Sequence, residues 1–216
     1  MTHLLFVRHG ETEWNLQRRV MGHRDSALTP TGIEQARRLA ARLRSVEFDA
    51  IYTSDLGRAV ATAAILAGER IVEVRRDARL RERRMGAFEG LTVPEMRERY
   101  SQERDAYERL GAEHFDGLDL ESVRDHAARV WECACELATR HEGGRVLVVT
   151  HGGVLTAMFL KVFEAPYVQA QKAKRPNAGI NLFVCDGGRW TMETWGDTAH
   201  LDGLRTLDDP INQPGA

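Results

Sequence analysis

The chain carries near its start the stretch Leu4-Leu5-Phe6-Val7-Arg8-His9-Gly10, in which four apolar residues run directly into an arginine and a histidine. Such a run predicts a short buried strand whose C-terminal end delivers a cation and an imidazole into a turn. In open α/β sheets, ligands bind at the C-terminal ends of the strands. We therefore expect this turn to belong to a ligand site.

A second stretch repeats the arrangement far downstream. Residues 146–150 read Val-Leu-Val-Val-Thr, another buried-strand pattern, and they lead into His151-Gly152-Gly153. Two strands that each end in His-Gly predict two imidazoles at one rim of one sheet. The two glycines open a predicted helix, and a helix N-terminus offers free backbone N–H groups and the positive end of the helix dipole.

The rest of the chain alternates between strand and helix patterns. Strands are expected at 50–53 and 71–74, helices at 30–43, 58–66, 94–110, 119–140 and 153–163, and a loop at 79–90. Residues 179–185 and 189–195 flank Asp186-Gly187-Gly188, which is a hairpin signal. This order predicts a three-layer α/β/α fold with a mainly parallel central sheet and an antiparallel edge. We expect one domain over 1–216, with a short helical insertion at about 91–118.

Composition narrows the class of protein. The 216 residues are 43% hydrophobic and carry a net charge of −2, which suits a globular core and disfavours a nucleic-acid binder. No apolar run approaches the roughly 20 residues that a membrane span needs, so no membrane partner is expected. Three cysteines make no disulfide framework, and we expect a reduced, cytoplasmic protein. The oligomeric state stays open, with a homodimer as one candidate.

Charged and nucleophilic side chains gather at the predicted strand ends and helix starts: Arg8, His9, Arg58, Glu82 and His151. Two arginines, two histidines and a helix N-terminus make a cradle for a dianionic phosphoryl group. An imidazole can attack phosphorus and so split hydrolysis into two easier steps. One carboxylate can then protonate the leaving alkoxide and later take a proton from water.

Five blocks of sequence carry a resemblance to a known family. Residues 8–15 read Arg-His-Gly-Glu-Thr-Glu-Trp-Asn, which resembles the R-H-G-[ET]-x-x-x-N signature of the histidine phosphatase superfamily, with its phosphoglycerate-mutase-like fold. The other blocks follow in the family's order at 28–36, 52–59, 80–90 and 149–153. The resemblance covers nearly all of residues 3–204, and the order and spacing of the blocks make it specific.

The resemblance implies roles for individual residues. His9 corresponds to the nucleophile that becomes phosphohistidine, and Glu82 to the acid and base. The implied phosphate contacts are Arg8, Asn15, Arg58, His151, the Gly152 backbone N–H and, near the nucleophile, Thr12. The residues expected to shape the substrate pocket are Met21, Gly22, His23, Arg24, Met85 and Phe88, together with segment 100–118. Neither a cofactor nor a metal is implied.

Two alternative roles are open to the histidines, metal binding and simple packing. Two histidines and a glutamate could ligate a metal, but the fixed positive charge of the neighbouring arginines would repel a metal ion. The histidines at 3, 23, 114, 126, 141 and 200 lack comparable context and are expected to be surface or packing residues. Of these, only His23 and His114 are expected within reach of a substrate pocket.

Within the superfamily, the sequence favours a phosphatase over a cofactor-dependent phosphoglycerate mutase. Mutases typically carry E-R-x-Y-G after the glutamate, whereas residues 82–86 read Glu-Arg-Arg-Met-Gly. Segment 91–118 also lacks the lysine and the Arg-Arg pair with which mutases bind a second anionic group. We therefore expect a phosphomonoester hydrolase acting on small phosphorylated metabolites. The alternatives are a mutase, an α-ribazole phosphatase, a fructose-2,6-bisphosphatase and an inactive phosphate-binding interaction protein.

Overall fold

The computed structural model describes residues 1–68, 70–103, 118–204 and 207. Within these residues a six-stranded sheet has the order β3-β2-β4-β1-β5-β6. The strands are β1 (Thr2–Arg8), β2 (Ala50–Thr53), β3 (Val74–Arg76), β4 (Arg145–Thr150), β5 (Ile180–Asp186) and β6 (Arg189–Asp197). The first four run parallel, whereas β5 pairs antiparallel with both β1 and β6. This confirms the predicted parallel sheet with a hairpin at its edge.

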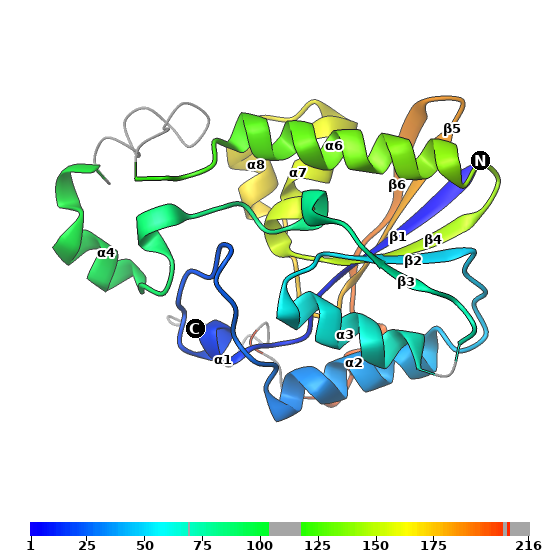
Figure 1. Ribbon diagram of the computed structural model, residues 1–216, viewed down its shortest axis with the longest axis horizontal. Coiled ribbons are helices and arrows are strands. Elements are labelled where there is room, and N and C mark those ends of the chain that lie inside the picture. Colours follow the sequence, from blue (N-terminus) through cyan, green and yellow to red (C-terminus); the bar gives the residue numbers. More distant parts are fainter. Residues whose placement is uncertain (69, 104–117, 205–206, 208–216) are drawn as a thin grey trace.

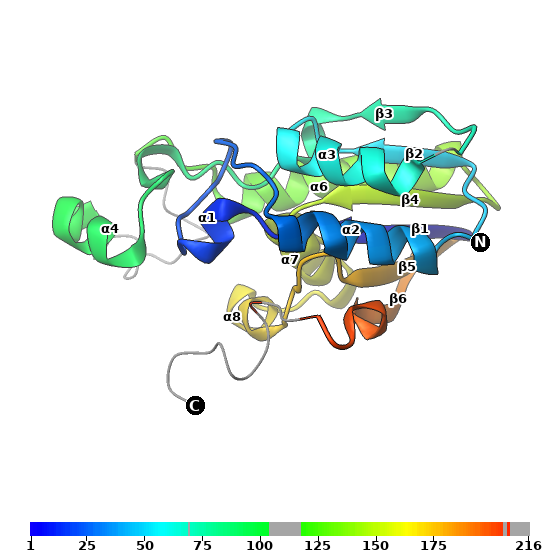
Figure 2. The same cartoon turned by 90° about the horizontal axis from the view of Figure 1, so that it is seen from below.

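Helices cover both faces of the sheet (Figures 1 and 2). One face carries α2 (Pro30–Arg42) and α3 (Gly57–Ala67), and the other carries α6 (Val123–Arg140) and α7 (Gly152–Phe163). Successive side chains of β1 point to opposite faces, so Phe6 packs in the α6 and α7 layer while Val7 packs under α2 and α3. Strands buried on both faces are continuous apolar runs, which is why β1 and β4 were predictable.

Several predicted boundaries differ from the structure. The third strand is Val74–Arg76, not 71–74, because backbone pairing with β2 falls on these residues while Ile71 is fully exposed. The long helix starts at Val123 and not at 119, because Leu120 pairs with Met85 in an isolated β-bridge and the side chain of Ser122 caps the helix. The expected loop at 79–90 contains parts of two short 3₁₀ turns, Ala78–Leu80 and Gly86–Phe88.

The smaller elements lie around the C-terminal ends of the parallel strands. They are α1 (Glu13–Leu16), α4 (Val93–Arg99) and α8 (Tyr167–Lys172), and a 3₁₀ turn, Ala199–Leu201, follows β6. Helix α4 accounts for the first part of the helix predicted at 94–110, whereas 104–117 lie outside the described residues. No helix in the described ranges combines the length and the apolar character needed to traverse a lipid bilayer.

Candidate active site

The two central strands end in register at one rim of the sheet. Arg8 of β1 pairs with Thr150 of β4, and the His9 backbone N–H donates to the Thr150 carbonyl over 2.9 Å. The next residue on each strand is a histidine, and the ring centroids of His9 and His151 lie 5.3 Å apart. The register of one strand pair therefore brings together two imidazoles that are far apart in the sequence.

His9 is held as a neutral imidazole in one tautomer. Its side chain is buried, and Nδ1 lies 2.7 Å from the Gly10 carbonyl oxygen. Because a carbonyl only accepts hydrogen bonds, Nδ1 carries the proton and Nε2 keeps its lone pair. Burial, followed by the positive charges of Arg58 and Arg8, lowers the pKa of His9 well below its usual value. Nε2 is therefore a free base at neutral pH.

His151 is a second buried imidazole beside the first. It is fully buried at the N-cap of α7, and neither ring nitrogen has a hydrogen-bond partner in the described part of the chain. Burial, and then Arg58 and His9, lower its pKa well below the usual value. Buried polar atoms without partners cost free energy, so such atoms commonly mark a place where a ligand binds.

Arg58 contributes a buried cation from the first turn of α3. Its Nη2 donates to the Gly22 carbonyl over 2.9 Å, and its Nη1 donates to the Arg24 carbonyl over 2.8 Å and to Asp25 Oδ1 over 3.2 Å. Its buried Nε has no partner among the described residues. The loop before α2 thus fixes the plane of the guanidinium and leaves part of it for an anion, which guanidinium groups bind well.

Glu82 is held against the start of α7. Its Oε2 accepts from the Gly153 N–H over 3.0 Å, and its Oε1 accepts from the Arg83 N–H over 2.8 Å. A Cβ on Gly153 would lie 1.9 Å from Oε1, so only glycine allows this approach. Burial raises the pKa of Glu82, but His126, the two backbone donors and Arg58 together outweigh burial and leave the pKa below its usual value.

The backbone of Glu82 is fixed from two further elements. Arg129 of α6 donates to the Arg79, Arg81 and Glu82 carbonyls over 2.7, 3.0 and 3.0 Å. The Nε2 atom of His23 also lies 2.9 Å from the Glu82 carbonyl. These contacts make Glu82 part of a rigid loop, and rigid support of this kind is what a catalytic acid requires.

Asn15 and Thr12 form a polar cap beside His9. They make a capping box at α1, in which Asn15 Oδ1 accepts from the Thr12 N–H and Thr12 Oγ1 accepts from the Asn15 N–H. Asn177 supports the same region by donating to the His9 carbonyl over 2.9 Å. The cap occupies the side-chain oxygen of Asn15 and leaves its amide N–H groups without a partner in the described ranges.

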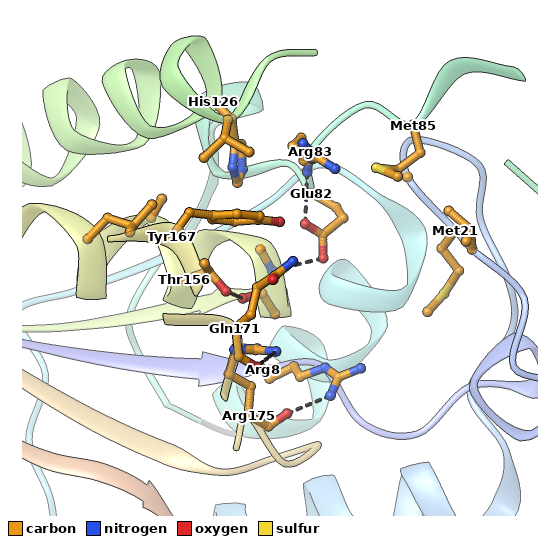
Figure 3. A pocket seen from close by; sticks show the side chains of 17 residues that line it. Arg8, Met21, Glu82, Arg83, Met85, His126, Thr156, Tyr167, Gln171 and Arg175 are labelled. Atoms are coloured by element: carbon orange, nitrogen blue, oxygen red, sulfur yellow. Dashed lines mark hydrogen bonds between the residues drawn. The ribbon is translucent and has the colours of Figure 1, made fainter. Parts of the chain in front are cut away.

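The site opens into a cavity of about 340 Å³ (Figure 3). Of the expected site residues, the cavity is lined by Arg8, Met21, Gly22, Glu82, Met85 and Gly152. Three expected pocket residues do not line the cavity. His23 contacts the Glu82 backbone, and the Arg24 carbonyl accepts a hydrogen bond from Arg58. Phe88 packs against Tyr100. Two of these three therefore support site residues without lining the cavity.

Other lining residues were not singled out by the sequence. Helix α6 contributes His126, α7 contributes Thr156, and α8 and the following turn contribute Tyr167, Gln171 and Arg175. His126 lies on the same apolar stripe as Val123 and Ala127, so its spacing matches that of core residues. Burial, and then Arg129, lower the pKa of His126 to about 4, so its imidazole is neutral at neutral pH. In the described residues, no three His, Cys, Asp or Glu side chains gather in a way that could hold a metal ion.

Comparison with known proteins defines the family. The model of the histidine phosphatase superfamily, branch 1, matches residues 4–198, and the chain belongs to this superfamily. It is 35% identical over 210 residues to phosphoglycerate mutase-like protein 4 of Arabidopsis thaliana, covering 92% of this chain and 86% of that protein. It is 35% identical over 220 residues to a metal-independent phosphoserine phosphatase of the same plant, covering 96% and 86%.

A solved structure agrees with this assignment. A mutant phosphoserine phosphatase of Entamoeba histolytica in complex with phosphoserine superimposes with a TM-score of 0.82 at 30% identity. The match covers 93% of this chain and 100% of that one. The fold implied by the sequence resemblance is thereby confirmed.

Proposed function

We propose that this protein hydrolyses phosphomonoesters of small metabolites through a phosphohistidine intermediate on His9. The observation that carries the proposal is the state of His9: a buried, neutral imidazole in one tautomer, with a free Nε2 beside Arg8, Arg58 and His151. A phosphoryl group in transfer needs stabilisation of the charge on its equatorial oxygens. Two guanidinium groups and the N-terminus of α7 supply that stabilisation without a metal.

The reaction runs in two steps. Nε2 of His9 attacks phosphorus, the bond between phosphorus and the ester oxygen breaks, and protonated Glu82 gives its proton to the leaving alkoxide. A water molecule then attacks the phosphohistidine, Glu82 takes a proton from that water, and Nε2 leaves as a free base. Phosphate departs, and both His9 and Glu82 return to their starting states.

A phosphatase is favoured over a mutase by the described part of the 91–118 segment. Its two arginines, Arg97 and Arg99, are exposed on α4 and do not line the cavity, so they hold no second anionic group there. The assay is 3-phosphoglycerate with and without 2,3-bisphosphoglycerate. We expect release of phosphate, and rapid bisphosphate-stimulated formation of 2-phosphoglycerate would support a mutase instead.

The direct test of the nucleophile is His9→Ala. This variant should lose essentially all turnover, whereas His141→Ala should keep it, because His141 contacts Tyr52 away from the cavity. Substantial turnover by His9→Ala would refute the assignment.

We also propose a cytoplasmic location for the protein. The three cysteines of the protein are free, which suits a reducing compartment.

A further inference from the structure

Asn177 is a buried amide side chain on the segment between α8 and β5. Because β5 runs antiparallel to β1, this segment lies beside the end of β1, where His9 follows the strand. The Ala178 N–H donates to the Arg8 carbonyl over 3.0 Å, and Asn177 Nδ2 donates to the His9 carbonyl over 2.9 Å. The segment is therefore fixed directly to the backbone that carries the proposed nucleophile.

The His9 carbonyl determines which way the amide of Asn177 faces. A carbonyl only accepts hydrogen bonds, so the atom of Asn177 that meets it is the nitrogen. The same Nδ2 also lies 3.4 Å from Asn15 Oδ1, so the two N–H groups of one amide serve two acceptors. Asn177 thus links the peptide of His9 to the side chain of Asn15.

The side-chain oxygen of Asn15 is held by a second residue as well. Asn15 Oδ1 accepts from the N–H and from the Oγ1 of Thr12, each over 3.1 Å. An N–H only donates, so the atom held here is the oxygen, and the amide nitrogen points the other way. The Thr12 contacts stay within α1, a helix that buries none of its four residues. The hydrogen bond from Asn177 connects Asn15 to the end of the central strand.

We propose that Asn177 is a positioning residue that orients the amide of Asn15, so that Asn15 donates an N–H to the phosphoryl group bound at His9. This inference rests on the proposed function, whose phosphoryl group is the anion that Asn15 would contact. An amide free to rotate could present its oxygen to the anion, and two acceptor oxygens repel each other. Holding that oxygen on Asn177 and Thr12 excludes the wrong orientation before the substrate binds.

The test is a double-mutant cycle on the affinity for inorganic phosphate, measured by calorimetry. Asn177→Ala should weaken phosphate binding by about 10-fold, the lower end of what a hydrogen bond to a charged group contributes. Asn15→Ala should weaken it at least as much. In the Asn15→Ala background, Asn177→Ala should cost less than about threefold, because the amide that Asn177 orients is already gone.

Asn181→Ala is the matched control. Asn181 is also a buried asparagine, and its Nδ2 donates to the Phe6 carbonyl of β1 over 3.2 Å. Its other contacts, with Gly179 and Gly196, lie outside the site. Its loss should leave the affinity for phosphate within about twofold of the wild type, because independent sites do not couple. If Asn177→Ala does not fold, Asn177→Ser, which keeps a polar group without the amide, replaces it in the cycle.

The same loss in the Asn15→Ala background as in the wild type would show that Asn177 acts through the His9 peptide or the fold, and would overturn the inference. Unchanged affinity in Asn177→Ala or in Asn15→Ala, or an equal loss in Asn181→Ala, would overturn it as well. Phosphate binding needs no turnover, which separates this inference from the proposed function. Coupling in a protein that forms no phosphohistidine would refute the proposed function alone, and a phosphatase without the coupling would refute this inference alone.

Discussion

Gly153→Ala tests whether Glu82 is the general acid by moving the carboxylate without removing it. The added Cβ would lie 1.9 Å from Glu82 Oε1 and 3.2 Å from the ring of His126. Since ordinary contacts begin at 3.4 Å, the carboxylate must retreat by about 1.5 Å and release the Gly153 N–H. The backbone of Gly153 is ordinary helix, and alanine is favoured over glycine in helices by up to about 1 kcal/mol, so the variant should fold.

The size of the effect depends on the leaving group. An alkyl alkoxide needs a proton in the transition state, and general acid assistance is worth about 10²–10⁴-fold in rate. A displacement of about 1 Å can cost 10²-fold. Phosphoryl transfer to His9 from an alkyl phosphate should therefore slow by at least about 100-fold. p-Nitrophenolate leaves without a proton, so transfer from its ester should slow by less than about 10-fold.

Rapid-quench measurement of the first step on both substrates provides the assay. Gly152→Ala is the structural control, because its Cβ would meet Arg8 Nε at 3.7 Å, an ordinary contact, and leave Glu82 in place. The ratio of alkyl to aryl rates should fall in Gly153→Ala and stay constant in Gly152→Ala. Glu82→Gln should reproduce the fall. Equal slowing of the two substrates by Gly153→Ala would refute the role of Glu82 as the acid.

Three further results are expected. The pKa of His9 lies well below its usual value, so kcat/KM for an alkyl phosphate, expressed per concentration of the substrate dianion, should show no acid limb near pH 6.5. Because the pKa of Glu82 is lowered, its protonated fraction and the rate should fall as pH rises. A profile that rises through pH 6.5 would contradict this. Glu89→Ala removes the carboxylate that accepts hydrogen bonds from the backbone N–H groups of His23, Arg24 and Met85. This variant should lower the free energy of unfolding by about 1–3 kcal/mol and raise KM. An unchanged urea midpoint together with an unchanged KM would argue against this role of Glu89. Overnight EDTA should leave turnover intact, and a loss restored by Mg²⁺ would count against charge stabilisation by arginine alone.

The fold was predictable where burial leaves a pattern in the sequence. β1 and β4 are apolar on both faces and could be located to within a residue or two. β3 could not, because Arg75 and Arg76 are exposed and join the sheet through backbone hydrogen bonds that do not depend on side-chain polarity. The start of α6 was misplaced because Leu120 is buried in a small cluster with Phe88, and an apolar residue in a loop resembles one in a helix.

The site was predictable to the extent that its residues follow strand ends. His9 and His151 come together because β1 and β4 are neighbours in register. His126 could not be found this way, because its spacing on α6 is that of a core residue. Arg175 follows a short helix and carries no motif, so only the path of the chain after α7 shows that it reaches the cavity.

The central claim is that phosphate is transferred to His9. Glu82→Gln should be mixed with p-nitrophenyl phosphate, because this variant still forms the phosphoenzyme but lacks the base for its hydrolysis. After an alkaline quench, mass spectrometry of the digested protein should find a phosphoryl group on the peptide that contains His9, with the acid lability of an N–P bond. A stoichiometric burst of p-nitrophenol should accompany it. Phosphate on another residue, or steady product release with no phosphorylated peptide, would contradict the account.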